Sequence, residues 1–155
     1  VKQCLQALES SPEYVPLIKL HPSDDSSSVR EVLHKLKYPD TILIEGQIIE
    51  ALMAADLVIT QLSTAVCEAA LLRKPIVLVN FSNMAGVEAY LEAGICLYAT
   101  NSAQLSAAIE TAFDSSVKAK MDAARARFIS EYFYRVDARA AQRVVEVLEG
   151  GLSRT

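Results

Sequence analysis

Short apolar runs alternate with amphipathic helical stretches along most of this chain. The five runs cover residues 15–20, 41–44, 57–60, 76–79 and 95–98 and are rich in Ile, Val and Leu. Nearly continuous apolar runs are typical of strands that are buried on both faces of a sheet. The helical stretches between them are long enough to connect parallel strands. The pattern predicts an α/β fold with a doubly wound, Rossmann-like parallel sheet of about five strands.

Helical periodicity fills the spaces between the strands and continues beyond the last one. Ser26–Ser28 are predicted to cap a helix, Gly94 to end one, and Asn101 with Gln104 to begin one as a capping box. Beyond Asp114 only helical patterns remain, so extra C-terminal helices are expected. The expected helices cover about 2–9, 29–36, 48–55, 63–72, 84–92, 102–113, 117–132 and 138–148.

Composition limits the class of protein. A chain of 155 residues with 52% hydrophobic residues fits one domain, expected over residues 1–149, with a polar tail at 150–155. A net charge of −4 does not suggest nucleic-acid binding. Three scattered cysteines without CxxC spacing argue against a disulfide framework or a zinc site and fit a cytoplasmic location. No apolar run is long enough to span a bilayer, and no metal is implied. The start at Val1 suggests a piece of a longer protein.

Several common chemical motifs are absent. The five glycines form neither a GxGxxG dinucleotide fingerprint nor a phosphate-binding P-loop, and no GxSxG nucleophile elbow occurs. Candidate residues must therefore come from the strand ends. Ligands of open parallel sheets bind at the carboxyl ends of the strands. The polar residues predicted there include His21, Gly46, Ser63, Thr64 and Asn80.

Ser63 and Thr64 open the helix predicted after the third strand. A helix N-terminus carries unpaired N–H groups and favours phosphate. Glu68 lies one turn further along the same face and is suited to accept hydrogen bonds from a ribose diol. The same spacing also fits an ordinary helix cap at Ser63 with Glu68 as a partner of the helix dipole, so both interpretations stay open.

His21 directly follows the first strand and precedes a proline. Pro22 restrains His21 to an extended conformation, which would aim the imidazole from the sheet edge toward a pyrophosphate. An ordinary loop histidine is the alternative. The acidic pair at 24–25 is interpreted as a turn before a helix rather than a metal site.

A basic cluster lies near the C-terminus. It is interpreted as a solvated helix face, with a phosphate contact, a contact to a further domain, or attraction to an anionic membrane surface as alternatives. Its members are Lys118, Lys120, Arg125, Arg127, Arg135, Arg139 and Arg143.

Three strings carry a resemblance to known families: LIKLHP, AADLVITQLSTAVCEAALLRKPIVLVNF and YRVDARAAQRVVEVL. The chain resembles the C-terminal nucleotide-binding half of GT-B fold enzymes. It is most similar to capsule-polysaccharide and CDP-glycerol glycerophosphotransferase types and to the UDP-N-acetylglucosamine 2-epimerase superfamily. In those families this half begins with a further strand, which this sequence lacks from Val1 onward, and the N-terminal acceptor domain precedes it.

The resemblance assigns roles to particular residues. It implies that His21 contacts the nucleotide phosphates, that Ser63 and Thr64 hold the pyrophosphate, and that Glu68 holds the ribose. Asp137 would begin the closing helix. The epimerases carry an acidic, glycine-rich turn where this chain has Leu62–Val66, a difference that favours a transferase-like relative.

The expected function is that of the donor-binding half of a GT-B glycosyltransferase-like enzyme in cell-surface polysaccharide or glycan synthesis. The ligand would be a UDP- or CDP-linked sugar, with no further cofactor, and the isolated domain would be inactive. Two rivals stay open: half of a non-hydrolysing UDP-N-acetylglucosamine 2-epimerase, and a non-catalytic module that kept the fold.

Overall fold

Strand β4 (Ile76–Val79) is the most deeply buried strand of the described residues, with all four of its residues buried. This computed structural model describes residues 1–9, 13–21, 25–36, 38, 40–44 and 46–152. β4 pairs in parallel with β3 (Val58–Thr60) on one side and β5 (Leu97–Ala99) on the other. Val58 lies opposite Ile76, and Val77 opposite Leu97.

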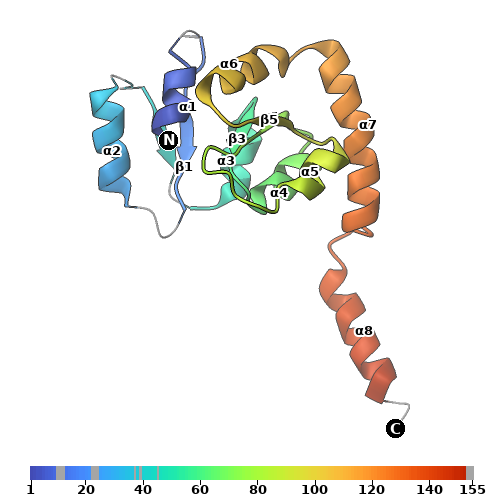
Figure 1. Cartoon of the computed structure of the whole chain (residues 1–155). Helices are drawn as coiled ribbons and strands as arrows, with labels where there is room; N and C mark the ends of the chain where they lie inside the picture. The colour runs from blue at the N-terminus through green and yellow to red at the C-terminus, as the bar shows by residue number, and fades with distance from the viewer. Residues whose placement is uncertain (10–12, 22–24, 37, 39, 45, 153–155) are drawn as a thin grey trace.

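Helices cover both faces of this sheet (Figure 1). Ile76 and Leu78 of β4 pack into one hydrophobic cluster, whereas Val77 and Val79 pack into another. Because side chains alternate along a strand, the two clusters lie on opposite faces of the sheet. The prediction of a doubly wound α/β fold with parallel strands is therefore confirmed.

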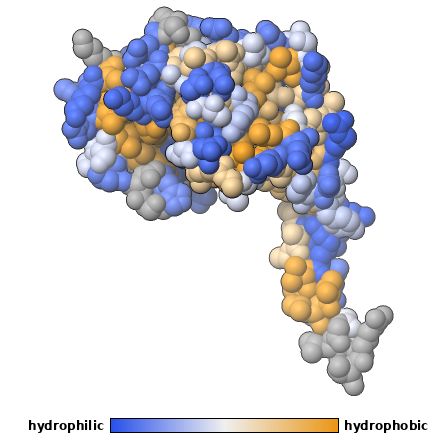
Figure 2. All heavy atoms as spheres, in the orientation of Figure 1, coloured by the Kyte–Doolittle hydropathy of each residue, from blue (hydrophilic) through white to orange (hydrophobic). Residues whose placement is uncertain are grey.

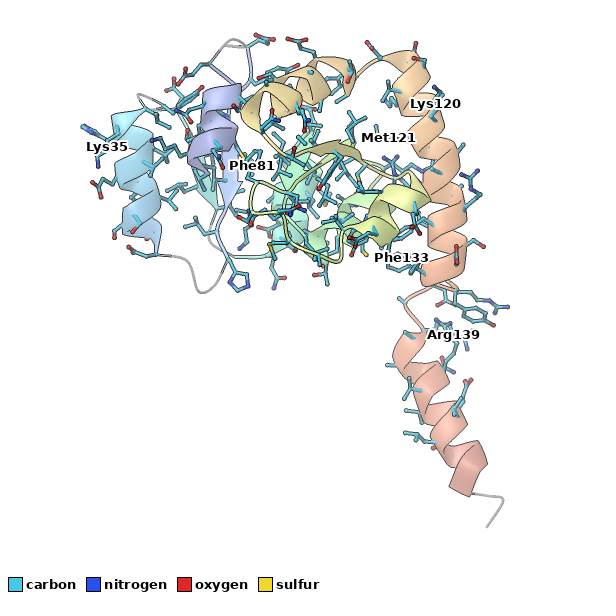
Figure 3. All side chains as sticks on the ribbon, viewed as in Figure 1. Lys35, Phe81, Lys120, Met121, Phe133 and Arg139 are labelled. Atoms are coloured by element: carbon cyan, nitrogen blue, oxygen red, sulfur yellow. The ribbon has the colours of Figure 1, made fainter. Side chains whose placement is uncertain are left out.

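The first cluster contains residues from α3 (Ile48–Ala54), α4 (Ala65–Leu71), α5 (Glu88–Ala93) and α7 (Ser115–Tyr132). The second contains residues from α1 (Lys2–Ala7) and α6 (Ser102–Thr111), two helices that pack against each other. Met121 of α7 is buried and Lys120 beside it is exposed, so one face of α7 packs inward, toward α4 and α5. Both residues are labelled in Figure 3.

The strands form two sheets rather than the single predicted one. β1 (Leu17–Lys19) pairs in parallel with β2 (Ile42–Ile44), and the described residues show no ladder between β1 and β3. Within the described strands, β1 and β3 therefore each have one open edge. Their side chains are mostly half-buried, unlike those of β4.

Helix ends follow local chemistry. α2 (Ser26–Lys35) is capped by Asp25, whose carboxylate accepts from the N–H groups of Ser27 and Ser28, so the predicted serine cap is wrong. The cap at Asn101 is confirmed, because its side chain accepts from Gln104 N at 2.9 Å. The predicted helix end at Gly94 is confirmed, and Gly94 ends α5 in the left-handed conformation at φ +70°.

The last helix, α8 (Ala140–Leu152), projects away from the rest of the molecule (Figure 1). Val144, Val147 and Leu148 on this helix are exposed, and Figure 2 shows an apolar surface there. No helix in the described part of the chain is both long and apolar enough to cross a membrane.

Candidate functional site

The turn from β3 into α4 presents two hydroxyl side chains to solvent. Ser63 and Thr64 are both exposed. Ser63 Oγ accepts from the N–H of Ala65 at 3.2 Å, so this hydroxyl supports the helix start. Thr64 is the residue at the N-cap, and its side chain makes no capping bond. The hydroxyl of Thr64 is therefore available to a ligand at the carboxyl end of β3.

Glu68 lies in the first turn of α4 and is half-buried. No hydrogen bond or ion pair joins its carboxylate to another described residue, so both oxygens can accept hydrogen bonds. Thr64 and Glu68 are four residues apart and therefore share a helix face. The structure thus brings together the three residues that the sequence placed at this turn.

Asn80 follows β4 and is buried, with 5% of its surface exposed. Its amide oxygen accepts from Met84 N at 2.7 Å, and its amide nitrogen donates to Met84 O at 2.9 Å and to Tyr98 Oη at 3.1 Å. These bonds engage the amide on both sides. Asn80 therefore holds the turn after β4 in place, whether or not it also contacts a ligand.

The turns after β3 and β4 touch each other. Gly86 has φ +97°, and a Cβ placed on it would lie 3.2 Å from Leu62 Cδ2. A larger residue at 86 would push against the turn that carries Ser63 and Thr64. Phe81, half-buried against the second cluster, anchors the turn after β4 and is labelled in Figure 3.

His21 and Gly46 follow the two paired strands of the other sheet. Both residues are exposed, and Gly46 has φ +128°, a conformation that favours glycine. Pro22, Ser23 and Glu45, which flank them, lie outside the described residues. The structure thus groups the candidates in two sets, one at each sheet, and the predicted pairing of His21 with Thr64 stays a prediction.

The basic cluster is not uniformly a solvated face. Lys118, Lys120 and Arg127 are exposed on α7, but Arg125 is buried with 3% of its surface exposed. The prediction was wrong for Arg125 because residue 125 lies four positions after Met121, on the face of α7 that packs inward. The spacing of Met121, Ala124 and Phe128 was a signal that could have revealed this.

Asp137 lies just before α8. Its carboxylate accepts from Arg139 N at 3.0 Å and from Arg143 Nη1 at 2.8 Å, and the bond from Arg143 is the main cause that lowers the pKa of Asp137. Asp137 therefore stabilises the first turn of α8, but this helix projects away from the rest of the molecule and does not close the domain as the resemblance implied. Within the part of the chain that the structure describes, no three His, Cys, Asp or Glu residues are grouped so that they could hold a metal ion.

Parallel strands with helices on both faces of the sheet define a Rossmann-like α/β domain. The chain belongs to the CDP-glycerol:poly(glycerophosphate) glycerophosphotransferase family, whose model matches residues 3–150.

Known structures show the same fold. The chain superposes with a TM-score of 0.58 and 20% identity on a protein from Listeria monocytogenes assigned as a UDP-N-acetylglucosamine 2-epimerase. The match covers 88% of this chain and 40% of that one, so this chain spans less than half the length of the solved relative. None of the curated proteins matches the chain.

Proposed function

We propose that this chain binds a nucleotide-diphosphate-linked donor and forms the donor half of a GT-B-type transferase in cell-surface polymer synthesis. The observation that carries the proposal is the family match over residues 3–150. The family description names CDP-glycerol, so a CDP-linked donor is the first to test, with UDP-linked sugars as the comparison. The exposed Thr64 hydroxyl and the unpaired Glu68 carboxylate support a ligand at the end of β3.

Each residue has a definite task in this proposal. The hydroxyl of Thr64 donates to a phosphate oxygen, and Glu68 accepts hydrogen bonds from the ribose hydroxyls. His21 donates to a phosphate oxygen from the neighbouring sheet. In glycosyl or glycerophosphoryl transfer, the nucleotide leaves with the bonding electron pair. Fixed donors around its phosphates stabilise the negative charge that develops there.

Nucleotide binding is the direct test. With a dissociation constant of ~0.1 mM, 1 mM CDP or UDP would stabilise the chain by about 1.4 kcal/mol, measurable as a thermal shift. Thr64→Ala and Glu68→Gln should each weaken binding by about 1–2 kcal/mol, roughly 5- to 30-fold. Glu110→Gln, an exposed change on α6 across the sheet, is the matched control and should bind as wild type does.

Two outcomes would contradict the proposal. If neither CDP nor UDP stabilises the chain, the result favours the non-catalytic module. If both site variants bind as tightly as wild type, the nucleotide lies elsewhere. A full-length protein that contains this chain separates the enzyme classes. A transferase releases nucleotide from its donor only when an acceptor is present, whereas an epimerase converts UDP-N-acetylglucosamine without one.

A further inference from the structure

A small cavity lies at the far end of α4 from Thr64, between the turn into β4 and helix α7. Arg73, Asp122, Arg125 and Ala126 line it, and its volume is about 120 Å³. One water needs roughly 10–15 Å³ of such volume, so a small polyatomic ion has room. Because α4 connects the carboxyl edge of the sheet to its amino edge, this cavity is separate from the proposed donor site.

Arg125 gives this cavity a buried and fixed cation. Its Nη1 donates to Asp122 Oδ1 at 2.5 Å, and its Nη2 donates to the carbonyl of Lys74 at 2.8 Å. Nε is buried and has no partner among the described residues. A guanidinium carries five N–H donors in a planar fork, so three of them are not used by these two bonds.

Arg73 supplies a second positive charge on the same cavity. It is exposed, and its guanidinium forms no hydrogen bond or ion pair with a described residue. It ends α4 at φ +56°, a left-handed position where glycine is usual, and the N–H of Lys74 reaches back to Ala69 O. The turn therefore places Arg73 at the cavity that Arg125 also lines.

The charges at the cavity do not cancel. Two arginines and one carboxylate, that of Asp122, line the cavity, and the carboxylate pairs with Arg125. Burial lowers the pKa of Arg125, the Asp122 carboxylate raises it, and the nearby Arg73 guanidinium lowers it again. The two arginines thus repel each other, and an anion between them would relieve that repulsion.

We propose that this cavity binds a tetrahedral oxyanion of the phosphate type, held between the guanidinium groups of Arg73 and Arg125. Arginine forks match phosphate geometry and bind it in two-point fashion. The bonds to Asp122 and Lys74 fix Arg125, and Arg73 closes the site from the solvent side. The proposal concerns the amino edge of the sheet and does not depend on the proposed donor site.

Inorganic phosphate is the probe, titrated into the whole chain at constant ionic strength while ³¹P NMR and the thermal midpoint are recorded. We expect saturable binding that Arg73→Gln weakens about tenfold, because a charge-assisted bond is lost. Asp122→Asn keeps a hydrogen-bond acceptor for Arg125 but removes the repelling charge, so it should bind phosphate more tightly. Lys118→Gln removes an exposed charge from the same helix, α7, and should change nothing.

Several results would overturn the proposal. The proposal is wrong if phosphate has no effect on wild type. It is also wrong if phosphate binds Arg73→Gln as tightly as it binds wild type. Binding that is lost in Thr64→Ala but kept in Arg73→Gln places the anion at the other end of α4. Methyl phosphate, titrated in parallel, shows whether the bound phosphate group belongs to an organic ligand or is free phosphate. Tighter binding of the ester indicates the phosphate group of an organic ligand, and weaker binding indicates free phosphate.

Discussion

Asn80 is the buried polar residue on which the turn after β4 depends. A buried amide that loses its partners costs free energy, and its partners Met84 and Tyr98 would lose theirs as well. Asn80→Leu should therefore lower the free energy of unfolding by about 2–3 kcal/mol in urea titration. Tyr98→Phe removes only one of the three bonds and should cost about 1 kcal/mol. Equal losses for the two variants would contradict this account.

The cap at Asp25 predicts that the stability of helix α2 depends on pH. Hydrogen bonds from the Ser27 and Ser28 side chains, followed by that from Ser27 N–H, lower the pKa of Asp25 from its ordinary value of 3.8 to about 2. A lowered pKa in the folded state means that the cap stabilises α2 fully above about pH 4. This stabilisation is lost as the pH falls toward 2.

The measurement compares wild type with Asp25→Ala by urea unfolding from pH 7 down to pH 2. The difference in stability should be constant above pH 4 and should shrink below it. A difference that persists unchanged at pH 2 would show that the carboxylate charge is not what stabilises α2. Arg30→Gln, an exposed change in the same helix at a group that does not titrate in this range, controls for general acid effects.

At the scale of elements, the open edges of β1 and β3 are the clearest departure from the expected single sheet. Two bonds at the ends of the ladder join β1 to β2: Ile42 N donates to Pro16 O, and Leu20 N donates to Ile44 O. In a parallel pair only every second residue of a strand bonds its neighbour. The peptide groups of Leu17 and Lys19 therefore face away from β2. In β3 the N–H of Val58 donates to Pro75 O, so the peptide groups of Val58 face β4. By the same alternation, those of Ile59 face away from β4.

Hydrogen exchange tests these edges. In this chain the amides of Lys19 and Ile59 should exchange faster than those of Ile18 and Thr60, which face their paired strands. We propose that the further strand implied by the family resemblance, if a longer protein contains it, pairs with the open edges of β1 and β3. The amides of Lys19 and Ile59 should then become protected. Unchanged exchange in the longer protein would rule out that strand pairing.

The sequence predicted elements well where burial alone determines them. β4 occurs over the four residues expected, because Pro75 precedes a continuous apolar run that both sheet faces bury. α5 was expected from residue 84 but begins at Glu88, because Asn80 holds Met84 in a turn through contacts that periodicity does not contain. The burial of Arg125 follows from its place on the apolar face of α7, whereas its bond to the carbonyl of Lys74, 51 residues away in the chain, does not follow from any local pattern.

The candidate site was predictable only in part. Thr64 and Glu68 share a turn of one helix, so their proximity follows from spacing alone. His21 belongs to a different sheet, and its relation to Thr64 depends on how β1 lies beside β3, which no local pattern encodes. The residues of the oxyanion cavity come from α7 and from the turn before β4, so only tertiary packing brings them together.

For the molecule as a whole, the projecting α8 has a practical consequence. Val144, Val147 and Leu148 are 59%, 74% and 61% exposed, and water around such a stripe favours its burial against any apolar surface. At high concentration the chain should self-associate through these side chains. Light scattering should show a lower average mass for the double variant Val144→Lys with Leu148→Lys.

The same two charges placed on α6, as Ala103→Lys with Ala107→Lys, should leave the scattering mass unchanged, since both alanines are exposed on a helix whose apolar side is already covered. A similar drop in scattering mass for both double variants would show that the added net charge, and not the loss of exposed apolar side chains, prevents self-association. Purification and crystallisation of this polypeptide therefore depend on a few valine and leucine side chains of its projecting last helix.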